Sequence, residues 1–179
     1  MKQSTRCRGQ YTDEPIAFGI YRCRTRYKKK HESDKEGGVK SSAFFYIHEV
    51  VYEEMIAYCR QGLPNEACGL ISGPAGTDTG HTLWKLPNEA KQKNRFLLSE
   101  DTVAEALEEI RRKGDQLTGI FHSHPTKVAY PSAMDIACNP YPGVAYIIIS
   151  FTDSPPDVRC FTMKDNKLQQ LDIVLFRNK

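Results

Sequence analysis

The 179-residue chain has no long apolar run, and its longest such segment, Val144 to Phe151, has only the length of a strand. A membrane-spanning helix needs about 20 consecutive apolar residues, so none is expected. The first thirty residues also lack a secretory apolar core, because Ile16 to Ile20 is short and arginines follow it. The sequence therefore predicts a protein that neither spans a membrane nor carries a signal peptide.

The six cysteines form no C-x-x-C pair and no regular spacing. This pattern argues against a disulfide framework and against a cysteine-rich zinc module, and it favours the reducing cytoplasm. Hydrophobic residues make up 40% of the chain and charged residues 26%, which is typical of a globular protein. We expect one cytoplasmic domain that buries a full core, in an oligomeric state that the sequence leaves open.

Positive charge is confined to one end of the chain. Residues 1–38 hold ten of the 25 Lys and Arg but only five of the 22 Asp and Glu, so their net charge is +5. Residues 39–179 carry a net charge of −2. The body of the protein therefore offers no electrostatic reason to bind nucleic acid.

Residues 1–38 also lack a sustained apolar period. We interpret them as a solvated basic extension, with an arm that binds nucleic acid or an acidic partner as the alternative. A third hypothesis comes from Lys35-Glu36-Gly37, whose codons can spell a bacterial ribosome-binding sequence shortly before a GTG start codon at Val39. In that case residues 1–38 are a translated leader, and the domain comprises residues 39–179.

From residue 43 onward, the apolar pattern predicts a mixed α/β layered domain. A helix is expected over 49–61, ending at Gly62, and a second one from Ser99 or Asp101 to about Lys113, where Gly114 stops it. The expected strands cover residues 43–47, 67–72, 82–86, 95–98, 117–122, 144–151, 158–163 and 168–176.

Two of the five histidines, His122 and His124, lie two residues apart at the predicted end of a strand. Side chains alternate along a strand, so both imidazoles should point to the same face. Pro125 then takes the chain out of the sheet. By itself, the pair is more typical of two ordinary, half-exposed histidines than of metal ligands.

A carboxylate, that of Asp135, follows His124 after ten intervening residues. In Pro131-Ser132-Ala133-Met134-Asp135, the spacing of Ser132 and Asp135 predicts a capping box at the start of a helix. Such a helix start would also hold the Asp135 carboxylate near the two imidazoles. Two histidines and one carboxylate, with a position left for water, are a ligand set of catalytic zinc sites.

A zinc hydrolase also needs a base, and Glu66 lies directly before an apolar strand. By itself, a charge at such a junction is typical of a solvated surface residue. Together, however, Glu66, His122-x-His124, Ser132 and Asp135 resemble the signature of the JAMM (MPN-plus) metalloproteases. The flanking sequences N-E-A-C-G-L-I-S-G, H-S-H-P and P-S-A-M-D fit as well. The resemblance covers residues from about 43 to 175, without departure at the five positions.

This resemblance implies a curved mixed β-sheet flanked by helices, an MPN domain of the cytidine-deaminase-like type. It implies one zinc ion per chain bound by His122, His124 and Asp135, with Glu66 as the general base and Ser132 as a donor to the oxyanion. The implied reaction is hydrolysis of an amide bond on the carboxyl side of a glycine.

The short spacings suggest which kind of member this is. Only 55 residues separate Glu66 from His122, so the insertions with which eukaryotic deubiquitinating members hold ubiquitin are expected to be absent or small. The chain resembles standalone prokaryotic members that cleave conjugates from the Gly-Gly tails of ubiquitin-like sulfur-carrier proteins.

Four alternatives remain open at this point. A non-haem iron oxygenase also uses two histidines and a carboxylate, but it leaves Glu66 and Ser132 without roles. A RadC-like protein linked with DNA shares the JAMM spacing, yet this chain has Thr126-Lys127 where Ser-Gly is typical. A zinc nucleobase deaminase would need a P-C-x-x-C pair, which the sequence lacks. A pure binding module is disfavoured by the intact ligand set.

Overall fold

The computed structural model describes residues 43–90, 95–137, 139, 141, 143–164 and 167–178. The predicted extension over residues 1–38 and the hypothetical start at Val39 lie outside the described residues. Within the described part, no helix has the length and apolar character needed to cross a membrane. Its three cysteines, Cys59, Cys68 and Cys160, are buried free thiols. A cytoplasmic location stays a prediction.

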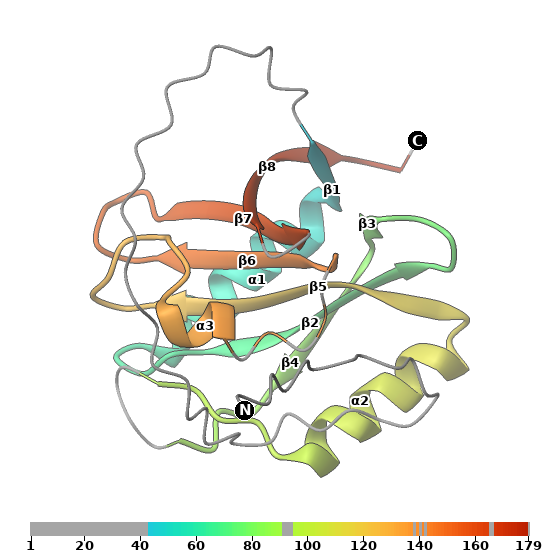
Figure 1. Cartoon of the computed structure of the whole chain (residues 1–179), viewed down its shortest axis with the longest axis horizontal. Helices are drawn as coiled ribbons and strands as arrows, with labels where there is room; N and C mark the ends of the chain where they lie inside the picture. The colour runs from blue at the N-terminus through green and yellow to red at the C-terminus, as the bar shows by residue number, and fades with distance from the viewer. Residues whose placement is uncertain are drawn as a thin grey trace, which may run out of the picture.

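The described chain forms one eight-stranded mixed sheet with three helices (Figure 1). The strand order is β3-β1-β8-β7-β6-β5-β2-β4; β1 is parallel to β3 and β8, β5 is parallel to β6, and the other pairs are antiparallel. The strands are β1 (Phe44–His48), β2 (Cys68–Pro74), β3 (Thr79–Gly80), β4 (Thr82–Leu86), β5 (Asp115–His124), β6 (Ala145–Ser150), β7 (Asp157–Lys164) and β8 (Lys167–Phe176). The helices are α1 (Glu49–Gly62), α2 (Glu100–Arg112) and α3 (Ala133–Ala137).

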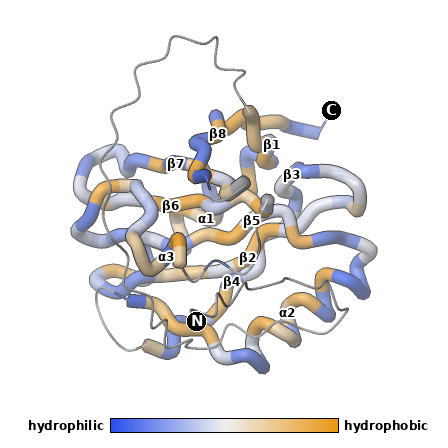
Figure 2. Tube along the Cα trace, in the orientation of Figure 1, coloured by the Kyte–Doolittle hydropathy of each residue, from blue (hydrophilic) through white to orange (hydrophobic). Residues whose placement is uncertain are grey.

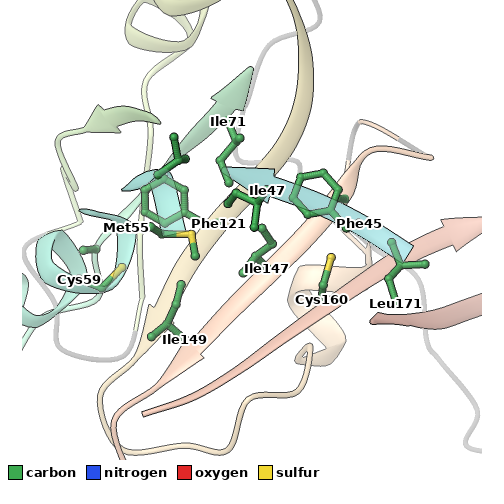
Figure 3. Close-up of a cluster of buried hydrophobic side chains, with 13 residues drawn as sticks. Phe45, Ile47, Met55, Cys59, Ile71, Phe121, Ile147, Ile149, Cys160 and Leu171 are labelled. Carbon is green, nitrogen blue, oxygen red and sulfur yellow. The ribbon is translucent and has the colours of Figure 1, made fainter. Parts of the chain in front are cut away.

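A hydrophobic core lies on each face of the sheet, which confirms the layered α/β fold. In Figure 1, α1 lies behind the sheet and α3 in front of it. Figure 3 shows the first core, in which Met55 and Cys59 of α1 pack with Phe121 of β5 and Ile147 of β6. The second core joins α2 to β2, β5 and β6 on the opposite face. Both faces of the central strands are therefore covered.

Both long helices form where local sequence signals agree with packing. In α1, the buried residues Val51, Met55 and Cys59 recur every four positions and so share one face. In α2, the Ser99 hydroxyl accepts a hydrogen bond from the backbone N–H of Thr102, which satisfies a free donor at the helix start. Gly114 follows α2 with a φ of +79°, a conformation that favours glycine.

Strand β6 carries a nearly continuous apolar run (Figure 2). All six residues of β6 and the last seven residues of β5 are buried. Strands with helices over both faces are apolar on both sides, which explains why β6 shows no alternation. This rigid centre of the sheet carries the two histidines at the end of β5.

The sheet is curved, so that β3, at one end of the strand order, approaches β2 near the other end. The backbone N–H of His81, directly after β3, donates to the carbonyl of Ser72 in β2 at 2.8 Å. Gly73 permits this approach, because a Cβ at that position would collide with the backbone oxygen of Thr79.

The expected elements are confirmed with two differences. The strand predicted over residues 95–98 is wrong: the backbone N–H of Leu97 bonds to the Asn88 side chain, and its carbonyl accepts from the N–H of Glu89. The Asn88 side chain and a backbone hydrogen bond from Glu89 therefore hold this segment, which is not one of the eight strands of the sheet. The short strand β3 was missed, because its two residues are too few for an apolar period.

Two adjacent phenylalanines of β1 allow a matched test of the core. Phe45 is 2% exposed and packs in the first core, whereas Phe44 is 48% exposed. We expect Phe45→Ala to lower the free energy of unfolding by about 3–5 kcal/mol, the usual cost of truncating a buried aromatic ring. The matched control Phe44→Ala should cost about 1 kcal/mol or less. Urea denaturation of both variants measures the difference, and equal losses would contradict this packing.

Candidate functional site

His122 and His124 occupy the end of β5, with their imidazoles on the same face. Both side chains are buried, and their Nε2 atoms lie 2.9 Å apart. The His122 ring is held between aromatic neighbours, with ring centroids 5.0 Å from Phe96 and 5.3 Å from Tyr146. Phe121, which directly precedes His122, packs in the core on the opposite face of the sheet. This confirms the predicted alternation of side chains.

Asp135 reaches the histidines from α3. The predicted capping box is present: the Ser132 N–H donates to Asp135 Oδ2 at 2.7 Å, and the Asp135 N–H donates to Ser132 Oγ at 3.2 Å. The other carboxylate oxygen, Oδ1, lies 3.8 Å from His122 Nε2 and accepts a hydrogen bond from the Tyr146 hydroxyl. Burial, together with the nearby Asp135 carboxylate, raises the pKa of Tyr146 well above its ordinary value, so this phenol remains a donor.

This donor set fits a divalent metal ion. One ligand atom from each of His122, His124 and Asp135 lies within 4.8 Å of the others. His124 Nδ1 lies 2.8 Å from the carbonyl oxygen of Val128, which can only accept a hydrogen bond. Nδ1 therefore carries the hydrogen, and Nε2 is left with its lone pair. Burial lowers the pKa of His122 to about 4, although the Asp135 carboxylate acts in the opposite direction. Because of this low pKa, the imidazole is neutral at physiological pH. Neutral imidazoles and a carboxylate are suitable metal ligands.

Glu66 lies in the short link between α1 and β2, and it is 5% exposed rather than solvated. Burial raises the pKa of its carboxyl group to about 7; the positive charge of Lys127 acts against this shift, and the negative charge of Asp135 adds to it. A carboxyl group with this pKa can both accept and return a proton near neutral pH.

Two buried hydrogen bonds join Ala67, the residue after Glu66, to the strand that carries the two histidines. The backbone N–H of Ser123 donates to the carbonyl of Ala67, and the N–H of Ala67 donates to Ser123 Oγ, both at 2.9 Å. Ser123 lies between the two histidines, and Ala67 directly follows Glu66. The pairing of Cys68 with His122 in the sheet continues this connection. The structure therefore brings together all five residues that the sequence singled out.

Sequence reasoning missed Asn88, whose amide connects Glu66 to the following loop. Its Nδ2 donates to the carbonyls of Glu66 at 2.7 Å and of Arg95 at 3.1 Å. Its Oδ1 accepts from the backbone N–H groups of Ala90 and Leu97. The available signal was its position directly after a strand and Pro87, where asparagine commonly bonds to nearby backbone. No local signal identified Tyr146 as a partner of the aspartate.

The raised pKa of Glu66 predicts how the stability of the metal-free protein depends on pH. Between pH 4.5 and about 7, the unfolded chain has lost this proton while the folded protein retains it, so stability falls as pH rises. Glu66→Gln removes this dependence. The difference in the free energy of unfolding between the variant and the wild type should therefore shift in favour of the variant by on the order of 3 kcal/mol from pH 4.5 to pH 8.

Urea denaturation in the presence of a chelator measures this gain at the two pH values. Glu105→Gln, at an exposed position of α2, is the matched control and should show no such gain. A pH-independent difference between wild type and Glu66→Gln would contradict the raised pKa.

Known proteins similar to this chain include a protein family and two named relatives. The model of the family described as prokaryotic homologues of the JAB domain matches residues 48–164. The CysO-cysteine peptidase of Mycobacterium tuberculosis is 27% identical over 99 residues, which are 55% of this chain and 68% of the relative. The desampylase of Haloferax volcanii is 29% identical over 103 residues, covering 55% of this chain and 74% of the relative.

A solved structure agrees as well. The solution structure of a protein from Desulfitobacterium hafniense has a TM-score of 0.68 and 31% identity, covering 75% of this chain and 94% of that chain. The family model spans the segment from the end of β1 to the end of β7, which contains all five candidate residues. This chain therefore belongs to the family of prokaryotic homologues of the JAB domain, in agreement with the JAMM-type signature and the MPN-like fold.

Proposed function

We propose that this protein is a zinc-dependent peptidase that hydrolyses the amide bond after the C-terminal Gly-Gly of a ubiquitin-like or sulfur-carrier protein. The observation that carries the proposal is the buried Glu66 carboxyl group, with a pKa of about 7, beside the cluster of His122, His124 and Asp135. The names of the two relatives, a CysO-cysteine peptidase and a desampylase, support this reaction and this kind of substrate.

The three ligands suit zinc. Two neutral nitrogen donors and one carboxylate leave a coordination position open, as in catalytic zinc sites. When bound, zinc supplies Lewis acidity, which polarises a carbonyl group and lowers the pKa of water. An iron oxygenase could use the same ligands, but the buried base and the capping serine would then have no chemical task.

Glu66 and Ser132 supply the remaining chemistry. Glu66 accepts the proton of the attacking water and returns it to the departing amine, a role that typically contributes about 10²–10⁴-fold to the rate. Ser132 Oγ already accepts the backbone N–H of Asp135, so its own hydroxyl proton is available for the oxyanion that forms at the scissile carbonyl.

The edge strand β4 supports binding of an extended tail. Leu86 of β4 pairs with Cys68, which in turn pairs with His122, so the end of this strand lies level with the metal ligands. On its outer side, β4 has no partner strand among the described residues. An extended peptide can add to such an edge through main-chain hydrogen bonds. Close to the metal, only glycine avoids a Cβ clash with the approaching backbone.

The body of the carrier would contact an apolar rim. Three exposed residues on the loop before α3 and on α3 itself, Val128, Tyr130 and Met134, flank Ser132 and Asp135 in the sequence. This small surface, without large insertions, favours weak affinity for the folded carrier, so recognition would depend mainly on the tail.

Metal binding and catalysis can be separated by substitution. The purified protein should bind one zinc ion per chain, and His124→Ala or Asp135→Ala should lose most of it, because two protein ligands are too few. Glu66→Gln should retain zinc yet lose hydrolysis, since an amide cannot accept the proton. Elemental analysis and an activity assay measure both; stoichiometric iron, or full activity of Glu66→Gln, would contradict the proposal.

The substrate proposal is tested with carrier fusions that end in Gly-Gly, Gly-Ala or Ala-Gly before the leaving amino acid. We expect cleavage of the Gly-Gly fusion and rejection of the Gly-Ala fusion, because an alanine Cβ at the cleaved position would collide with the site. Mass spectrometry of the products, with and without a chelator, measures this directly. Equal turnover of all three fusions would exclude the glycine requirement, and turnover without metal would exclude the mechanism.

Asn88 should influence the catalytic rate through the position of Glu66. We expect Asn88→Ala to lower kcat at least about tenfold while zinc content and KM stay nearly unchanged, since a misplaced base slows proton transfer but not tail binding. Glu89→Gln is the matched control: Glu89 bonds the same loop to Ser99 and Thr102 without contacting Glu66. If the control loses as much activity, the effect reflects general loop stability.

A further inference from the structure

One charged residue near the site has no role in this mechanism. Lys127 is the only cation in the loop of residues 125–131, which joins the ligand His124 to the capping Ser132. Its side chain is exposed, and within the described part of the chain its ammonium group forms no ion pair or hydrogen bond. A free positive charge therefore lies at the rim of a centre whose own side chains are acidic or neutral.

The main chain at Lys127 is anchored on both sides. The hydroxyl of Ser150, the last residue of β6, donates to the Lys127 carbonyl at 2.7 Å. The next carbonyl, that of Val128, accepts a hydrogen bond from the Nδ1–H of His124 at 2.8 Å. Ser150 and His124 are themselves paired across β6 and β5. The lysine side chain therefore starts from a fixed point beside the metal ligands.

The Lys127 ammonium group interacts electrostatically with the Glu66 carboxyl group. Burial is the main cause of the raised pKa of Glu66, and the positive charge that opposes it is that of Lys127. The positive charge of Lys127 thus acts on the proposed base from the loop that follows His124.

In the proposed reaction, water adds to the glycine carbonyl carbon, the C–N bond breaks, and Glu66 returns a proton to the released nitrogen. That nitrogen therefore departs next to Glu66 and within the field of Lys127. If the leaving group is a free amino acid attached through its α-amine, its carboxylate lies only two bonds from this nitrogen. An amine from a lysine side chain brings no carboxylate to this place.

We propose that Lys127 is a specificity-determining residue that binds the α-carboxylate of the leaving group. The preferred substrate is then a Gly-Gly tail that carries one amino acid with a free carboxylate, rather than an isopeptide or a longer extension. This inference rests on the proposed function and refines it. A charge-assisted hydrogen bond of this kind discriminates strongly between a carboxylate and a neutral amide of the same shape.

The test uses the zinc-loaded full chain and two carrier substrates that differ in a single group. One ends in Gly-Gly-Ala with a free carboxylate, and the other ends in the same sequence as the C-terminal amide. We expect kcat/KM to be at least about tenfold higher for the acid in the wild-type protein. Lys127→Met should abolish this preference, whereas Lys127→Arg should keep most of it.

Lys113→Met is the matched control, because Lys113 pairs with Asp115 at the opposite end of β5. This variant should keep the preference for the acid. Calorimetry with zinc-loaded Glu66→Gln, which binds without turnover, should show tighter binding of the acid peptide than of the amide. Adding Lys127→Met to that variant should equalise the two affinities.

The outcomes separate the two levels of inference. If the wild type cleaves acid and amide equally, or if Lys127→Met slows both by the same factor, Lys127 only tunes Glu66 and the carboxylate site is refuted while the peptidase function stands. If neither substrate is cleaved by the zinc-loaded wild type, the proposed function fails, and the inference about Lys127 fails with it.

Discussion

The site depends on the pair of buried hydrogen bonds between Ser123 and Ala67. These bonds connect the strand of the two histidines to the link that holds Glu66, across 56 residues of sequence. Each bond uses a backbone N–H that would otherwise be buried without a partner, so breaking either would cost about 1–3 kcal/mol. The serine between the histidines therefore has a structural task, because it fixes the link that carries the proposed base against the strand that carries two of the proposed ligands.

The same strand pairing explains why the site tolerates so many buried polar groups. Glu66, His122, His124 and Ser123 are all buried at one end of β2 and β5. Ser123 and His124 form hydrogen bonds within the protein, and two aromatic rings hold His122. Two groups are exceptions. His122 Nδ1 has no hydrogen-bond partner among the described residues. The Glu66 carboxylate is desolvated without a neutralising partner in contact in this part of the chain, and its pKa rises as a result. Burial thus turns an ordinary acid into a base suited to neutral pH.

The surrounding loops arrange the centre from two directions. Asn88 holds the carbonyl of Glu66 from the segment after β4, and Phe96 of the same segment packs against the His122 ring. On the other side, the loop before α3 supplies the carbonyl that orients His124 and carries the exposed Lys127. One loop therefore positions the base and a ligand, while the other presents the groups that a substrate would meet.

The sequence by itself determined the helices and most of the strands, because these depend on local signals such as apolar periods, caps and glycines. It also determined all five candidate residues, because their spacing matches a family signature. It could not decide that residues 95–98 bond to Asn88 instead of to a strand, since that choice depends on a side chain seven or more residues away. It also could not separate a solvated Glu66 from a buried one.

Only the tertiary structure decided the burial, the pKa values and the neighbours of each group. Tyr146 meets Asp135, and Lys127 acts on Glu66, because β5, β6 and the ends of two loops converge at one point. Such convergence depends on strand order and sheet curvature, which involve residues far apart in the chain. Electrostatic effects depend on distance and desolvation in space, so no local pattern in the sequence encodes them.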